Sequence, residues 1–520
     1  MTYPTLPLLF CQPANYNARL LLRLIRLNPV LDLLLKLAAL VYLVSTSFVL
    51  VFLAGFGVLL AIYLWTRRHA PHLPHIPDAE LLPVTVQLPI YNEPAVVDRL
   101  LDACARLDYP RDRLHIQVID DSTDGTSAII AGRVRQMQAA GLRHIQHIHR
   151  ARRDGYKAGA LAHGMQFVES ECVVIFDADF VPGPDFLRRT MPHFSADPRL
   201  GLLQTRWDHL NPDYNLLTRA QALSIDAHFG IEQVARSRGH LPMSMNGTGG
   251  IWRVQAIADA GGWSADTLTE DLDLSYRAFM RGWRFLYRVD VAVPGELPPL
   301  IQLYKQQQAR WATGSTQCLL RHSRALLACR RCTPLDKLMG LLHLAQYAIQ
   351  PVILVLFLLT PLLLAAGFFD RLPNLAAFAL LGLIPPAIIA LAQFELHPDW
   401  PRRLLYFPVQ LAAGVAIVAS NSRAVITAVL RHHEQLEFWR TPKFRLTRPA
   451  ERPLAPLAAW PGIDGLTLAE LALAAYALLG LFIAAGTTPA LVPYMLTYAL
   501  SFSLFALGNI VQARRLGVVA

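Results

Sequence analysis

Long apolar segments towards both ends of the chain limit what it can fold into. One runs from 37 to 65, and five more follow at about 339–366, 373–396, 404–430, 465–486 and 489–513. A helix of about 20 such residues crosses the ~30 Å hydrocarbon core of a bilayer. Only 17% of the residues are charged, against about 25% in an average soluble protein. We therefore expect a membrane protein.

The basic charge of the chain indicates a membrane surface rather than nucleic acid. The net charge is +10, and nearly all of the 48 basic residues are arginine. No DNA- or RNA-binding module is recognisable, so we expect no nucleic-acid partner. Cytoplasmic loops that face anionic lipids account for such an excess, and the same field attracts an anionic nucleotide. No cleavable signal peptide is expected, because the first long apolar run lies too far from residue 1.

The charges around 404–430 conflict with its hydropathy. Arg402 and Arg403 precede it, and six basic residues follow it: Arg431, Arg440, Lys443, Arg445, Arg448 and Arg452. The positive-inside rule therefore puts both of its ends in the cytoplasm. We expect 404–430 to lie along the membrane interface as a helix, while the other four C-terminal segments cross. Arg19, Arg23 and Arg26 would lie outside if 37–65 crosses once, so a second, short or re-entrant element at the N-terminus is an alternative.

Residues 84–300 have the pattern of an α/β domain. Apolar runs of strand length (84–91, 115–121 and 172–179) alternate with helical stretches (95–107, 126–140 and 158–169). Such alternation predicts a mostly parallel sheet covered on both faces, with ligands at the carboxyl ends of its strands. The predicted organisation is a membrane anchor (1–66), a linker (67–83), the α/β domain (84–300), an interfacial region (301–335) and a membrane domain (336–520).

Acidic residues follow two of the predicted strands. Asp177 and Asp179 in "IFDADF" suit a hard divalent ion that also holds phosphate oxygens, although such pairs also form turns and caps. Asp120 and Asp121 in "DDSTDGT" are suited to a nucleoside's ribose or base, or to an Asx-turn with a helix N-cap. Both interpretations remain open from the residues alone.

Two further motifs lie at predicted helix starts. Lys157 in "GYKAGAL" is one of only five lysines, and it could meet a diphosphate or simply be solvated. "TEDLDLSYRA" (269–278) supplies acids that either complement a helix dipole or provide a general base.

Of the six cysteines, only Cys329 and Cys332 are close together. An isolated "CRRC" lacks the second pair that a structural zinc site needs, so we expect no metal or redox role there.

Seven motifs occur in a familiar order: "QLPIYNE", "IQVIDDSTD", "GYKAGAL", "FDADF", "NGTGGIWR", "TEDLDLSYRA" and "QQARW". Over roughly 84–315 the chain resembles the processive glycosyltransferases of family two. It is similar to the cellulose synthase and hyaluronan synthase group, and most similar to the plant cellulose synthase-like A and C proteins, which are mannan or glucan synthases. The resemblance implies a cytoplasmic α/β catalytic domain of GT-A type (Rossmann-like), combined with an all-α transmembrane domain in the plasma (inner) membrane.

The resemblance also implies roles for individual residues. The donor-binding set is Tyr91, Glu93, Asp120, Asp121, Lys157 and Arg310; the acceptor-binding pair is Gln307 and Trp311; the metal ligands are Asp177 and Asp179. Asp271 is the implied general base. "FWRTPK" (438–443) resembles the cytoplasmic gating loop of cellulose synthases, with Phe438, Thr441 and Lys443 at matching positions and Arg440 in place of the family's valine.

The function implied is inverting, processive transfer of hexose from UDP-glucose or GDP-mannose, with Mg²⁺ or Mn²⁺, to a growing β-glucan or β-mannan that is passed across the membrane. An alternative is a non-processive enzyme that glycosylates a membrane lipid. The gating-loop motif and the closely spaced C-terminal helices favour the polymer. A non-catalytic transporter is disfavoured, because transporters place functional charges within the membrane, whereas here the acids cluster in the α/β domain.

Overall fold

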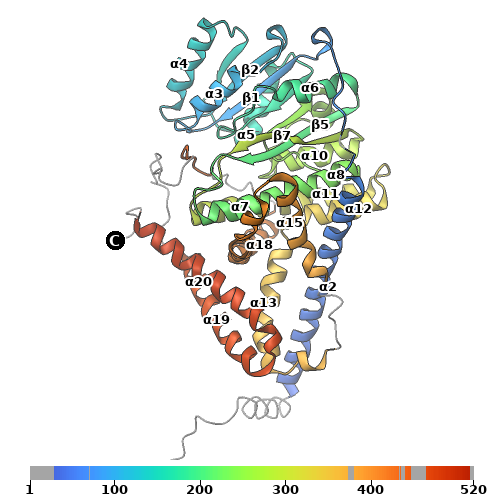
Figure 1. Ribbon diagram of the computed structural model, residues 1–520, viewed down its shortest axis with the longest axis vertical. Coiled ribbons are helices and arrows are strands. Elements are labelled where there is room, and N and C mark those ends of the chain that lie inside the picture. Colours follow the sequence, from blue (N-terminus) through green and yellow to red (C-terminus); the bar gives the residue numbers. More distant parts are fainter. Residues whose placement is uncertain are drawn as a thin grey trace, which may run out of the picture.

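The computed structural model describes residues 29–69, 71–372, 380–432, 434, 440–446 and 464–515. An α/β body forms one end of the molecule, and long helices extend away from its lower side (Figure 1). Helices that are far apart in the sequence lie side by side there, since α2 (Pro29–Thr66) contacts α13 (Ile349–Ala365).

The body is built on one seven-stranded sheet in the order β3-β2-β1-β4-β6-β5-β7. The strands are β1 (Val84–Ile90), β2 (Leu114–Asp120), β3 (Ile145–His149), β4 (Cys172–Ile175), β5 (Leu200–His209), β6 (Gly250–Arg253) and β7 (Arg284–Gly295). Only β6 runs antiparallel to its neighbours β4 and β5 among these strands. The predicted mostly parallel sheet is confirmed.

Helices cover both faces of this sheet, as runs of valine and isoleucine require. In β4, Val174 packs in a core shared with α3 (Val97–Ala105), α4 (Thr126–Ala139) and α6 (Phe186–Ala196). The adjacent Val173 packs in a second core with α5 (Tyr156–Gly164), α9 (Val254–Asp259) and α10 (Glu270–Arg281). Successive strand residues point to opposite faces, so β4 is buried on both sides.

A third core joins the body to the long helices. Side chains of α7 (Leu216–Ala227), the π-helical turn His228–Glu232 and α8 (Gln233–Arg238) pack with Leu59 and Tyr63 of α2 and with α15 (Ile384–Leu396). The body is therefore seated directly on the apolar helices.

Among the described residues, four helical segments are long and apolar enough to cross a membrane. They are α2, Phe407–Leu430, α19 (Gly465–Thr487) and Pro489–Arg515, which contains α20 (Val492–Arg515). A fifth exists if α12 (Pro334–Leu344) and α13 are counted together. The chain thus has several helices that could cross a membrane, as predicted.

Two predicted segments differ in shape from the expectation. The span 339–366 is divided into α12 and α13, which meet at 64°; Pro351 then lies in the first turn of α13, where its missing N–H costs least. Of 373–396, residues 373–379 lie outside the described residues, and the rest is the turn Leu380–Leu383 followed by the 13-residue α15. That described part is shorter than the ~20 residues of a straight span.

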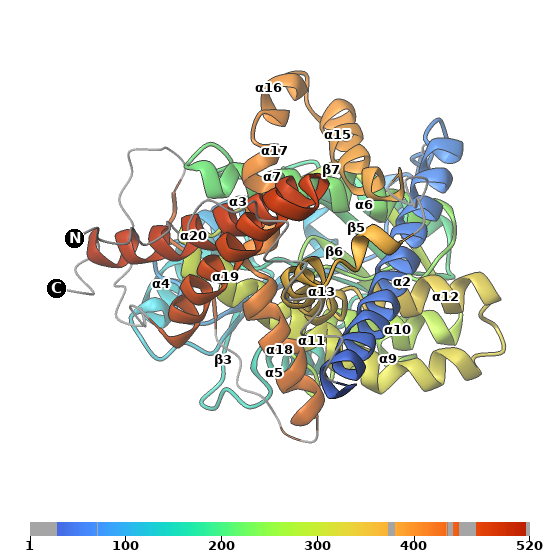
Figure 2. The ribbon, with the colours of Figure 1, turned by 90° about the horizontal axis from the view of Figure 1, so that it is seen from below.

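The segment 404–430 is broken into α17 (Phe407–Ala416) and α18 (Val418–Leu430), after the short α16 (Trp400–Leu404). Figure 1 draws α18 end-on and α13 lengthwise, whereas Figure 2 draws α13 end-on and α18 lengthwise, so α18 lies across α13. In the apolar window of Phe407–Leu430, 61% is buried inside the protein, against 22%, 28% and 39% for the other three segments. Composition permits a span, and the interfacial position of 404–430 stays a prediction.

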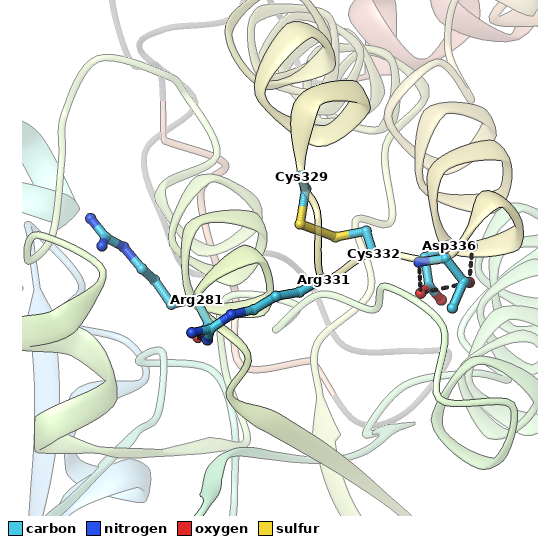
Figure 3. Close-up of a disulfide and its surroundings, with 6 residues drawn as sticks. Arg281, Cys329, Arg331, Cys332 and Asp336 are labelled. Atoms are coloured by element: carbon cyan, nitrogen blue, oxygen red, sulfur yellow. Dashed lines mark hydrogen bonds between the residues drawn. A yellow bond between two sulfur atoms is a disulfide. The ribbon is translucent and has the colours of Figure 1, made fainter.

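Cys329 and Cys332 form a disulfide in the turn between α11 (Ile301–Ala328) and α12 (Figure 3). The next residue, Thr333, caps α12 through a reciprocal pair of hydrogen bonds with Asp336. This bond was not predicted from the sequence, in which the isolated pair indicated no metal or redox role.

Candidate active site

Most of the predicted site residues line one cavity of ≈200 Å³ at the carboxyl ends of the strands. They are Tyr91, Glu93, Asp121, Lys157, Asp177, Asp179, Asp271, Gln307, Arg310, Trp311, Thr441 and Lys443. Asp120 is not among the residues that line this cavity, and Phe438 lies outside the described residues. Residues up to 352 positions apart in the chain are brought to one place by the fold.

Three functional groups converge beside Gly247, in the loop that leads into β6. A Cβ atom at Gly247 would lie 3.2 Å from Asp271 Oδ2, 3.5 Å from Lys157 Nζ and 4.0 Å from Asp177 Oδ2. The backbone here has φ +78°, which favours glycine. The glycine therefore lets the loop approach the three side chains closely.

Lys157, at the start of α5, bridges this group. Its Nζ donates to Asp177 Oδ1 at 2.6 Å and to the Gly247 carbonyl at 2.8 Å, and it lies 3.6 Å from Glu270. Burial alone would lower the pKa of Lys157, but the carboxylates of Asp177 and Glu270 raise it above its ordinary value. The lysine is therefore a fixed positive charge on the cavity wall.

Asp271 lies in the first turn of α10, where the helix N-terminus meets the cavity. Burial and the neighbouring Glu270 raise the pKa of Asp271 above its ordinary value, while Lys157 opposes the shift. A carboxyl group with a raised pKa is a stronger proton acceptor than an exposed one. This environment suits a general base.

Asp179 meets a different lysine. Its Oδ2 accepts from Lys443 Nζ at 2.7 Å and from the backbone N–H of Glu296 at 3.2 Å. Burial alone would lower the pKa of Lys443, but Asp179 raises it. The two aspartates thus present hard carboxylate oxygens to one cavity, each beside an ammonium group; this donor set fits Mg²⁺ or Mn²⁺.

The loops after β1 and β2 contribute Tyr91, Glu93 and Asp121 to the cavity wall. Arg153 lies over the ring of Tyr91 at 3.6 Å, and Arg150 makes two 2.6 Å bonds to the carboxylate of Asp121. Arg440 donates to Glu93 at 3.2 Å, and burial raises the pKa of Glu93 to about 7 despite that contact. An aromatic ring beside charged groups is suited to a nucleoside.

Asp120 is fully buried behind this wall. Its carboxylate accepts from Ser127 at 2.5 Å and lies 2.9 Å from His147 and 3.3 Å from His149. The three ligand atoms of Asp120, His147 and His149 lie within 4.8 Å of one another, a nitrogen-rich set that suits zinc better than Mg²⁺ or Mn²⁺. Asp120 therefore joins β2 to β3, and the cavity-facing acid of the pair is Asp121.

The first half of α11 contributes a further part of the cavity wall. Gln307, Arg310 and Trp311 share one helix face because they are three and four positions apart. The ring of Trp311 lies 6.3 Å from that of Trp207, which is 5.1 Å from Phe180. These rings form an apolar wall of the kind on which sugars stack.

Three further residues that line the cavity were not predicted from the sequence: Trp207, Phe180 and Glu296. Glu296 directly follows β7, so the rule that polar residues at strand ends build the site could have found it. No comparable signal singles out Trp207, because a tryptophan in a strand is usually core.

Residues 82–314 match the family described as "Glycosyltransferase like family 2". The probable glucomannan 4-beta-mannosyltransferase 2 of Oryza sativa subsp. japonica is 38% identical over 313 residues, or 59% of this chain and 53% of that protein. Glucomannan 4-beta-mannosyltransferase 2 of Arabidopsis thaliana is 46% identical over 235 residues, or 44% of each. This chain therefore spans about half the length of the curated relatives that it matches.

Among solved structures, a mannosyltransferase from Pyrobaculum calidifontis in complex with GDP-Man and Mn²⁺ has a TM-score of 0.51 at 22% identity. The match covers 77% of this chain and 100% of that one. It confirms the predicted GT-A-type fold.

Proposed function

We propose that this chain, whose residues 82–314 form a glycosyltransferase family 2 domain, is a membrane-integrated enzyme that adds hexoses from a nucleotide sugar to a growing β-linked polysaccharide. The observation that supports this most directly is the convergence of Asp271, Lys157 and Asp177 beside Gly247. A proton acceptor, a fixed cation and a metal-binding carboxylate within one small volume are what transfer from a nucleoside diphosphate needs.

In this proposal Asp271 accepts the proton of the acceptor hydroxyl. The hydroxyl oxygen attacks the anomeric carbon from the side opposite the diphosphate, the glycosidic bond forms, and the bond to the diphosphate oxygen breaks. The configuration at the anomeric carbon is thereby inverted. Lys157 and Arg310 neutralise the charge that develops on the leaving group, and Trp311 with Trp207 stacks the acceptor sugar.

Asp177 and Asp179 would hold the divalent ion. Their carboxylates face the same cavity, and Mg²⁺ or Mn²⁺ bound there would supply further positive charge to the diphosphate. Tyr91, Glu93 and Asp121 would contact the nucleoside.

Mannose from GDP-mannose is the proposed sugar, because the relatives are named as glucomannan mannosyltransferases. UDP-glucose and a glucan product are the second candidate pair. We further propose that the catalytic domain faces the cytoplasm of the plasma (inner) membrane, that residues 438–443 act as a gating loop, and that the apolar helices translocate the polymer.

The test is an incorporation assay on membranes that contain this protein. Labelled GDP-mannose and UDP-glucose are supplied separately, with Mn²⁺, Mg²⁺ or EDTA, and products are divided into lipid-extractable and insoluble fractions. We expect an insoluble product from GDP-mannose that β-mannanase digests, and its loss with EDTA and in Asp177→Ala.

A product that is wholly lipid-extractable would favour the alternative of lipid glycosylation. Label from UDP-glucose in a β-glucanase-sensitive product would replace mannan by glucan. No incorporation from either donor under these conditions would contradict the transferase proposal.

A further inference from the structure

Residues 440–446, called the strap here, lie against the catalytic cavity from outside the α/β body. Arg440, Thr441 and Lys443 line the cavity. Phe444 is 0% exposed and Leu446 is 1% exposed. A segment without helix or strand has no regular backbone partners, so other groups must satisfy its N–H donors.

Glu296 supplies two of these partners. Its Oε1 accepts from the backbone N–H of Phe444 at 2.8 Å, and its Oε2 accepts from that of Arg445 at 2.9 Å. The side chain of Glu296 is only 2% exposed. Arg445 has φ +58°, an unfavourable backbone conformation for this residue type. The carboxylate thus holds the strap where its backbone bends.

The same residue touches the proposed metal ligand. The backbone N–H of Glu296 donates to Asp179 Oδ2, which also accepts from Lys443 of the strap. Arg99 lies 3.6 Å from the Glu296 carboxylate and donates to the Asp179 carbonyl at 3.3 Å. The strap and Asp179 are therefore connected through one residue at the end of β7.

An apolar contact anchors the strap beside Glu296. Phe444 and Leu446 pack with Leu303 of α11 and Ala513 of α20. The strap is consequently held between the catalytic body and the last of the apolar helices.

We propose that Glu296 is a positioning residue whose carboxylate fastens the strap over the donor end of the cavity, so that Lys443, Thr441 and Arg440 face the bound nucleotide. This proposal rests on the proposed function for its consequence in donor binding. The fastening itself is a property of the unliganded protein.

The test uses the full chain in lipid nanodiscs and combines limited trypsin digestion with donor kinetics. Cleavage after Lys443 and Arg445 is quantified by mass spectrometry without ligand. Glu296→Gln keeps the backbone N–H bond to Asp179 but turns an amide NH₂ towards one strap N–H. We expect about tenfold faster strap cleavage, since cleavage follows the population of the released state, and a KM for the donor raised by a similar factor with a smaller change in kcat.

Three further variants distinguish fastening from misfolding or a direct role in chemistry. Glu296→Asp keeps the charge and both oxygens, and should restore part of the protection. Phe444→Ala removes the apolar anchor instead, and should reproduce faster cleavage and the higher KM. The exposed Glu434, which pairs with Arg431, is the matched control: Glu434→Gln should change neither quantity.

Unchanged strap cleavage in Glu296→Gln, with the fold intact by thermal unfolding, would overturn the proposal. Faster cleavage without a change in the donor KM would also overturn it, because the fastened strap would then not contribute to donor binding. If the wild-type protein transfers no sugar, the proposed function fails, and the fastening is judged by the cleavage rates alone.

Discussion

At the scale of single residues, the environment of Asp271 differs from that of the other acids in the cavity. Asp177 and Asp179 each accept a hydrogen bond from a lysine, whereas burial and Glu270 make ionisation of Asp271 harder. Groups of one chemical type therefore have different surroundings in this cavity. Among these carboxylates, Asp271 is the one whose environment suits the uptake of a proton.

Replacing Asp271 by asparagine should therefore remove transfer while leaving nucleotide binding nearly intact. Loss of a general base costs about 10²- to 10⁴-fold in turnover. Turnover of labelled donor and calorimetry with GDP and Mn²⁺ measure the two effects. A variant that retains more than about a tenth of wild-type turnover would show that Asp271 is not the base.

The pH dependence of kcat/KM in the wild-type protein is a second test of Asp271 as the general base. A base with a raised pKa is protonated, and inactive, as the pH falls through that value, so kcat/KM should decline on the acid side well above the ordinary carboxyl pKa of about 4. Glu93, whose pKa burial raises to about 7, could produce a similar limb. The decline should persist in Glu93→Gln, and its disappearance there would assign it to Glu93.

At the scale of elements, prolines mark where two of the apolar helices begin. Pro385 and Pro386 stand in the first turn of α15, and Pro408 stands in the first turn of α17. Proline is tolerated in a first turn, whereas in a helix interior it removes a hydrogen bond; among the apolar helices, α13 keeps such a proline, Pro361. Hydropathy does not include the effect of proline on a helix. It therefore predicted longer helices than the structure contains.

The orientation of α18 leads to a labelling prediction. Single cysteines at positions 400 and 434, in a background without native cysteines, should both be shielded from impermeant thiol reagents added outside intact cells, because an interfacial segment keeps both ends in the cytoplasm. A cysteine at Thr488, in the turn between α19 and α20, is the control and should be labelled. Labelling at 434 would make Phe407–Leu430 a true span and would remove the strap from the nucleotide.

At the scale of the whole molecule, a buried ion pair connects the catalytic body to the apolar helices. Lys305 Nζ lies 2.5 Å from Glu470 Oε2, and the two side chains are 3% and 0% exposed. Lys305 is on α11, two positions before Gln307, and Glu470 is on α19. Gln302 adds a 3.3 Å bond to Asp464 beside it. Helix α11, which forms part of the cavity wall, is therefore fixed to a proposed membrane span.

Glu470→Gln should destabilise the protein by about 3–5 kcal/mol, because it removes the carboxylate that pairs with the buried Lys305 ammonium. Thermal or denaturant unfolding in detergent measures the loss. The double variant with Lys305→Met should recover much of it. Lys36→Met, in the exposed Lys36–Asp32 pair, is the control and should change stability by less than about 0.5 kcal/mol. An equally small effect of Glu470→Gln would mean that the pair is not buried as described.

The sequence by itself determined the alternation of strands and helices and the placement of Asp121, Asp177 and Asp179 at strand ends. The alternation follows from periodicity within a few residues. The placement of the acids follows because ligands of such a sheet bind at the carboxyl ends of its strands. The roles of these residues stay predictions. Tertiary structure decided that Asp120 turns to His147 rather than to the cavity. It also joined Glu296 to a strap about 150 residues further on, because a contact at that separation depends on packing and leaves no local pattern in the chain.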